Sequence, residues 1–186
     1  KELLNSTEAK KQKKLLKKLK KYEKITDRME IEITEYITKL SNEEITPKTS
    51  LRLRSILNIC NDLERMGDIY FQISKTLERK IEENGFFLAD QRNYLNDMVD
   101  KVEAALKIMT NNLNEPSYDN VNIDEAKYAE KEINVMRDTL RGHNLSRIGD
   151  EDYNPKMAMV YNNIFSSFEK VGDHIINVTE SVVGEI

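Results

Sequence analysis

The sequence has few of the residues that would build a disulfide scaffold, a sheet or a membrane span. Its single cysteine, Cys60, excludes an internal disulfide and fits a reducing compartment. Three prolines and six glycines among 186 residues leave few breaks in helices, and tryptophan is absent. No run approaches the roughly 20 apolar residues that span a bilayer, and no signal-like segment opens the chain. What remains is a chain of helical composition with 33% charged residues.

The spacing of apolar residues predicts five helices joined by short breaks. Thr49 or Ser50 is the expected cap of the second helix, and Asn84-Gly85 its expected end, since both residues accept the left-handed conformation. Strand-like alternation is essentially absent. The sequence therefore predicts an all-α antiparallel bundle, with helices at about residues 6–40, 49–83, 89–113, 123–144 and 155–183.

One short motif occurs twice, 105 residues apart and each time inside a predicted helix: Glu64–Asp68 (ERMGD) and Glu169–Asp173 (EKVGD). A repeat at this offset predicts two related three-helix units. The expected division is a lysine-rich start of the first helix (1–22), a first repeat (23–114), a linker (115–122) and a second repeat (123–186). Only two helices are predicted after the linker, so the second repeat is either incomplete or completed by residues outside this chain.

The two motifs place like charges together. Residues four apart share a helix face, so Glu64 repels Asp68, and Glu169 repels Asp173. The first predicted helix repeats the spacing at Glu23 and Asp27, and the fourth repeats it less fully, with Asn134 replacing the second acid after Glu130. Acid pairs that converge from neighbouring helices are most simply held together by a cation bound through oxygen. The alternative is that these are solvated surface acids.

Each motif also contains a glycine inside a helix, which costs about 1 kcal/mol relative to alanine. We therefore expect Gly67 and Gly172 to allow close approach of a neighbouring helix backbone or a bound group. The only histidines are His143 and His174, and neither follows a glutamate by three residues as in di-iron helical bundles. His174 is expected to flank the site rather than to be a ligand. No catalytic or organic-cofactor-binding residue is predicted.

The net charge of −4 hides an uneven distribution. Residues 1–24 hold ten lysines against three glutamates, a balance of +7, so the remainder sums to −11. The lysines form either a solvated helix face or a surface for anionic partners, with the inner leaflet of a membrane favoured. The acidic remainder argues against nucleic acid as a partner.

At these motifs the sequence resembles the PhoU family of phosphate-transport regulators. The matching segments are Asp62–Tyr70, Phe168–Asn177 and the acidic stretch Glu23–Glu30. The resemblance implies two related three-helix bundles, a regulatory rather than catalytic role, and metal clusters of iron or zinc, with magnesium or calcium as alternatives. The ligands it implies are Glu23, Asp27, Glu64, Asp68, Glu130, Glu169 and Asp173. Asn134 departs from the acidic pattern, so one cluster is expected to be weaker or absent.

Similar domains form the cytoplasmic end of bacterial sodium/phosphate cotransporters, and the lysines of residues 10–24 suit a position just inside a membrane. The implied partner is a membrane phosphate transporter, in the same chain or a separate one. The implied location is the cytoplasm, as a free-standing regulator or as a domain of an inner-membrane protein, and a homodimer stays open. Two competing hypotheses are a di-metal carboxylate enzyme and a purely structural bundle that oligomerises.

Overall fold

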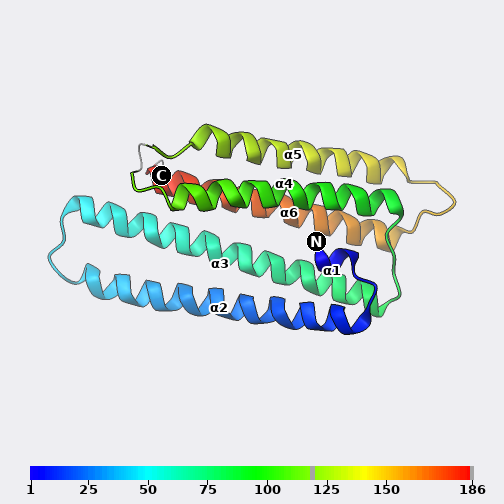
Figure 1. The fold of residues 1–186 in the computed structure, drawn as a ribbon, viewed down its shortest axis with the longest axis horizontal. Coiled ribbons are helices and arrows are strands. Elements are labelled where there is room, and N and C mark those ends of the chain that lie inside the picture. Colours follow the sequence, from blue (N-terminus) through cyan, green and yellow to red (C-terminus); the bar gives the residue numbers. More distant parts are fainter. Residues whose placement is uncertain (118–119, 185–186) are drawn as a thin grey trace.

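The computed structural model describes residues 1–117 and 120–184, which form helices and connecting loops without a strand (Figure 1). The predicted all-α bundle is confirmed. Residues 118–119 of the predicted linker and 185–186 of the predicted second repeat lie outside the described residues. The helices are α1 (Glu2–Asn5), α2 (Ala9–Ser41), α3 (Pro47–Glu82), α4 (Ala89–Leu113), α5 (Ile123–Ser146) and α6 (Pro155–Val183).

The helix boundaries follow local capping chemistry. α3 begins earlier than predicted because Thr46, rather than Thr49 or Ser50, is its cap: the Thr46 hydroxyl accepts the backbone N–H of Thr49 at 3.1 Å. Pro47 then occupies the first turn, where its missing N–H is harmless. Asn84 adopts a left-handed φ of 52° just after α3, at the predicted end. α1 was not predicted, because four residues are too few to show a period.

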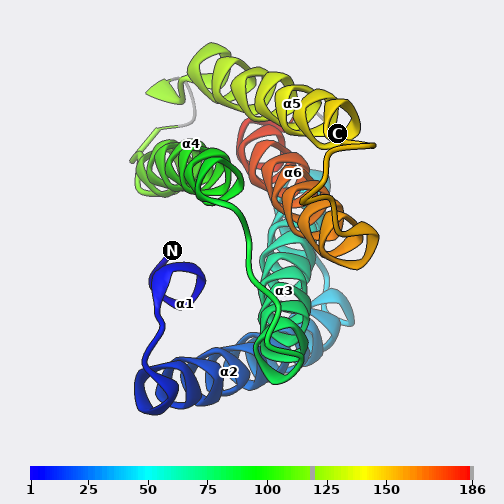
Figure 2. The ribbon, with the colours of Figure 1, turned by 90° about the vertical axis from the view of Figure 1, so that its right-hand side faces the viewer.

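The packing departs from the order of the helices in the chain at one point, because α3 packs on α6 although α4 follows it. α4, α5 and α6 pack on one another, α3 packs on α6, and α2 packs on α3 (Figure 2). The connection at residues 83–88 carries the chain from α3 to this three-helix set. Its Phe87 is buried and meets the Tyr161 ring of α6 at 5.9 Å between centroids. The predicted boundary at 115–122 therefore falls between two helices that pack together, and α2 and α3 form a separate hairpin.

The core lies mainly among α4, α5 and α6. Leu95, Met98, Ile133, Tyr161 and Phe165 are all at most 1% exposed. α2, by contrast, has Ile37 as its one fully buried side chain. It forms an outer edge of the bundle, with its lysines exposed. None of the described helices combines the length and the apolar character needed to cross a bilayer.

Candidate metal centre

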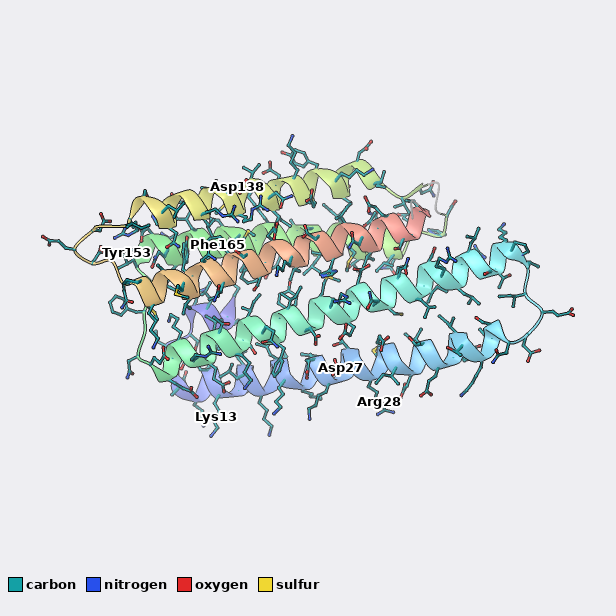
Figure 3. All side chains as sticks on the ribbon, turned by 180° about the vertical axis from the view of Figure 1, so that it is seen from behind. Lys13, Asp27, Arg28, Asp138, Tyr153 and Phe165 are labelled. Atoms are coloured by element: carbon teal, nitrogen blue, oxygen red, sulfur yellow. The ribbon has the colours of Figure 1, made fainter. Side chains whose placement is uncertain are left out.

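The strongest candidate site lies between α2 and α3. Figure 3 places Asp27 where α2 faces α3, while Lys13 and Arg28 lie on the outer side of α2. Glu23 and Asp27 of α2 and Asp68 of α3 each offer a carboxylate oxygen, and these oxygens lie within 4.8 Å of one another. We call Glu23, Asp27, Glu64 and Asp68 the first cluster, since Glu64 lies one turn before Asp68.

The electrostatics of the first cluster show an excess of negative charge. The pKa of Glu64 is raised, first by burial and then by the charges of Asp68 and Asp27. One carboxylate oxygen of Asp27, Oδ1, is shielded from solvent and has no hydrogen-bond partner among the described residues. A shielded, unpartnered acceptor beside other carboxylates fits a cation bound through oxygen, as iron, zinc, magnesium or calcium can be.

Gly67 explains how α2 comes close enough to α3. A Cβ added at Gly67 would lie 2.5 Å from the Thr26 hydroxyl oxygen, well inside van der Waals contact. That hydroxyl donates to the Glu23 carbonyl at 2.8 Å, so it is already engaged on α2. Gly172 of α6 plays the same part, since an added Cβ would lie 3.1 Å from two Ile133 side-chain carbons of α5. A neighbouring helix does come close at both glycines, but the atoms that come closest belong to its side chains and not, as predicted, to its backbone.

The other predicted acids meet between α5 and α6, in what we call the second cluster: Glu130, Asn134, Glu169 and Asp173. Here Asn134 donates its amide to Glu130, and the Arg137 guanidinium pairs with Glu169. Arg137 Nη1 also lies 3.4 Å from the Asn134 side-chain oxygen. The pKa of Asp173 is raised, first by burial and then by Glu169 and Glu130, with His174 and then Arg137 acting in the opposite direction. The second cluster thus contains a cation bonded to one of its acids, whereas at the first cluster Arg65 acts on Glu64 through its charge.

The comparisons with known proteins agree with this architecture. Residues 2–77, which include α1, α2, nearly all of α3 and the whole first cluster, match the family model described as the PhoU domain. Residues 2–77 are therefore PhoU-like. The chain is also 27% identical over 133 residues to the Phosphate-specific transport system accessory protein PhoU homolog 1 of Thermotoga maritima. That alignment covers 69% of this chain and 54% of the relative, so the chain spans about half the relative's length.

Two residues that contact the second cluster or its flank were not found from the sequence. One is Arg137, which follows Asn134 by one helical turn. The other is Asp62 of α3, which is 8% exposed and has Oδ1 2.7 Å from Nδ1 of His174 and 3.3 Å from the amide of Asn177. His174 therefore ties α3 to α6 beside the second cluster. The sequence could have pointed to Arg137, because the repeat aligns it with an acid of the first helix. The contact between Asp62 and His174 could not be found in this way, because the repeat gives no sign of it.

Proposed function

We propose that this chain is a non-catalytic regulatory module in phosphate transport. Two observations support the role: the PhoU domain match over residues 2–77, and the phosphate-transport accessory protein to which the chain is similar. The described residues offer carboxylate clusters and helix surfaces. The module acts by contact with a transporter, and a bound cation sets the geometry of the contacting surface.

The cation is proposed to bind at the first cluster. The single observation that carries this is the convergence of Glu23, Asp27 and Asp68, whose ligand oxygens lie within 4.8 Å of one another. Three carboxylates this close repel one another in the folded state, and a divalent cation removes that repulsion. Iron or zinc is expected, with magnesium and calcium as the alternatives. Bound cation would hold α2 on α3, because its ligands come from both helices.

The test is the metal content and metal response of the full chain purified without chelator or affinity metal. We expect bound metal by elemental analysis and a rise in unfolding temperature when Fe²⁺ or Zn²⁺ is added to stripped protein. A ligand at 100 times its Kd stabilises the fold by about 2.7 kcal/mol. Asp27→Asn and Asp68→Asn should abolish this rise. Glu35→Gln, an exposed acid on the same helix, is the matched control and should keep it. No bound metal and no thermal response to any of the four cations would refute the cation centre.

The enzymatic alternative is disfavoured by where the histidines lie. His143 meets Asp90 at 3.0 Å, and His174 meets Asp62 at 2.7 Å, so both lie in contacts outside the first cluster. A di-metal oxidase or hydrolase usually relies on histidine ligands and an open coordination position. Oxygen-consumption and phosphate-ester hydrolysis assays on the metal-loaded chain should show no turnover. Turnover that is lost in Glu64→Gln would establish the enzyme instead.

The partner is proposed to be a membrane phosphate transporter, in the same chain or a separate one, on the cytoplasmic side. The lysines of residues 10–24 are exposed, whereas Leu15, Leu16 and Leu19 pack towards the core. Such a basic face suits the anionic inner leaflet, at about 1 kcal/mol per lysine near the surface. The full chain should co-sediment with phosphatidylserine vesicles and not with phosphatidylcholine vesicles, and glutamine at Lys13, Lys17 and Lys20 should weaken this. Equal binding to both vesicle types would contradict the membrane contact. Light scattering during gel filtration would decide between a monomer and the homodimer.

A further inference from the structure

The two clusters are related position by position, and the structure supplies the register. Gly67 and Gly172 are the glycines of the repeated motif, and their closest neighbours across the helix pair are Thr26 and Ile133. These two neighbours lie 107 residues apart in the sequence, which is also the offset between Glu23 and Glu130. Packing and sequence thus agree on one alignment of α2 with α5.

Extended by one turn, this alignment makes Glu30 of α2 the counterpart of Arg137 of α5. It also pairs Asp27 with Asn134. Glu30 accepts a hydrogen bond from the Thr34 hydroxyl at 3.2 Å. Its charge also reaches α3: burial first, and then Glu30, raises the pKa of Cys60, which lies one turn before Glu64. The α2 positions of this alignment, Glu23, Asp27 and Glu30, are therefore all acidic. At the corresponding α5 positions an amide, Asn134, stands in place of one carboxylate and a guanidinium, Arg137, in place of another.

We propose that Arg137 is the built-in counter-ion of the second cluster, so that this cluster takes no metal and the chain carries one cation centre, between α2 and α3. Whether a cluster binds a metal ion or is neutralised by its own arginine depends on the residue at one aligned position, which is Glu30 in α2 and Arg137 in α5. The inference deepens the proposed cation centre and rests on it for the count of metal sites. Its second element, the structural role of Arg137, stands without any metal.

The contacts of Arg137 carry the proposal. Its side chain is only 22% exposed and pairs with Glu169, which is 18% exposed. Its Nε donates to Asp138 at 3.0 Å, and its Nη1 faces the Asn134 oxygen, so the guanidinium is held from both α5 and α6. Arginine keeps its charge at all relevant pH values and forms directional bonds to carboxylates. A metal ion at Glu169 would have to displace this group and tolerate a like charge beside it.

The second cluster also has fewer side-chain oxygens available to a metal ion. Glu130 accepts the amide of Asn134, which places a hydrogen-bond donor where the first cluster has the Asp27 carboxylate. The amide oxygen of Asn134 is a ligand type that hard cations accept, but it faces Arg137 Nη1 at 3.4 Å, and the amide nitrogen that donates to Glu130 is not a metal ligand. Asp173 is left with Glu130 and Glu169 as acidic neighbours, and both of these are already bonded to α5 side chains. The donor set therefore fits a metal at the first cluster and does not fit one at the second.

The first experiment exchanges the deciding residues and counts bound metal. Stripped full chain is titrated with Zn²⁺ and Fe²⁺ by calorimetry, and its metal content is measured after desalting. Glu30→Arg should lose the wild-type metal. Asn134→Asp with Arg137→Glu should create a second set of sites and about double the bound metal. Arg141→Glu, an exposed arginine that also faces Asp138, is the matched control and should leave the count unchanged. A wild-type count that falls by half in Glu169→Gln, or a double variant that gains no metal, would overturn the proposal.

A second experiment separates this inference from the proposed function. If wild-type protein binds no metal, the cation centre fails, but Arg137 can still be tested by urea unfolding of metal-free protein. Arg137→Met should raise the unfolding equilibrium constant about tenfold, and adding Glu169→Gln should recover most of it. Arg137→Lys keeps the charge and serves if the methionine variant does not fold; it should keep wild-type metal content. An Arg137→Met variant as stable as wild type, with no coupling to Glu169, would refute the counter-ion role.

Discussion

Replacing Gly67 by alanine tests the contact that brings the first cluster together. The added methyl would lie 2.5 Å from the Thr26 hydroxyl oxygen, about 1 Å short of comfortable van der Waals separation. The Thr26 hydroxyl is bonded to the Glu23 carbonyl, so relief requires either loss of that bond or movement of α2 away from α3. Movement of α2 would also separate Glu23 and Asp27 from Asp68.

The expected magnitude comes from two opposing effects. Alanine gains about 1 kcal/mol over glycine inside a helix, and crowding of this kind costs about 1–3 kcal/mol. Gly142 of α5 provides the matched control, because it is exposed and an added Cβ there would meet no atom within 4 Å. Gly142→Ala should therefore raise the free energy of unfolding by about 1 kcal/mol. Gly67→Ala should fall below it by the full crowding cost, about 1–3 kcal/mol.

The assay is urea unfolding of metal-free protein, with a double-mutant cycle at Thr26. Thr26→Ala removes the crowding oxygen, so Gly67→Ala should be much less costly in that background, with a coupling energy of about 1–3 kcal/mol. The affinity for Zn²⁺ should fall in Gly67→Ala and recover in the double variant. If Gly67→Ala stabilises the protein as much as Gly142→Ala and the cycle shows no coupling energy, the close contact between Gly67 and Thr26 is refuted.

Three further predictions concern single groups. Glu64→Gln should stabilise metal-free protein at neutral pH. A raised carboxyl pKa contributes stability that is fully present below the ordinary value of 4.5 and lost as pH rises through the folded value, so the difference from wild type should vanish in acid. Asp90→Asn should destabilise the protein at neutral pH. Burial acts to raise the pKa of Asp90, but hydrogen bonds from the Gln91 backbone and His143, together with the Arg147 charge, lower it overall. Its stabilisation is therefore present above the ordinary value of 3.8 and lost as pH falls through the folded value. Thermal unfolding between pH 3 and 8 measures both, and parallel curves would contradict the assignments. Tyr161→Phe should raise the free energy of unfolding by about 1 kcal/mol, because the buried hydroxyl has no hydrogen-bond partner among the described residues; a loss in urea unfolding would show a missing partner.

The long helices could be predicted from the sequence because their apolar period is unbroken. Predicted bounds for α4 and α6 agree with the structure, and the start of α3 was missed only because Thr46 and Thr49 are both plausible caps. Which helices pack together could not be predicted, since amphipathic faces do not name their partners. Phe87 of the connection to α4 is buried against Tyr161 of α6, and a buried aromatic in a short loop has no periodic signature.

For the site, the repeat identified the acids and the two glycines, but it did not show which of the acids are paired with a cation. Arg137 carries a charge that the sequence shows plainly, yet only coordinates reveal that it points at Glu169 rather than into solvent. The Asp62–His174 contact joins residues 112 positions apart on helices that the repeat treats as equivalent, and nothing in their spacing links them. Metal binding at Glu23, Asp27, Glu64, Asp68, Glu130, Glu169 and Asp173 stays a prediction; of these, Glu23, Asp27 and Asp68 offer carboxylate oxygens within 4.8 Å of one another.

The one-sided attachment of α2 has a consequence for the dynamics of the molecule. A helix of 33 residues with a single fully buried side chain can detach while α4, α5 and α6 stay folded, so its amide hydrogens should exchange with solvent first. The carboxylates that bridge α2 and α3 then control how often this partial opening occurs. Supply of a bridging cation would set the lifetime of the ordered lysine face, and so the time available for any encounter made through it.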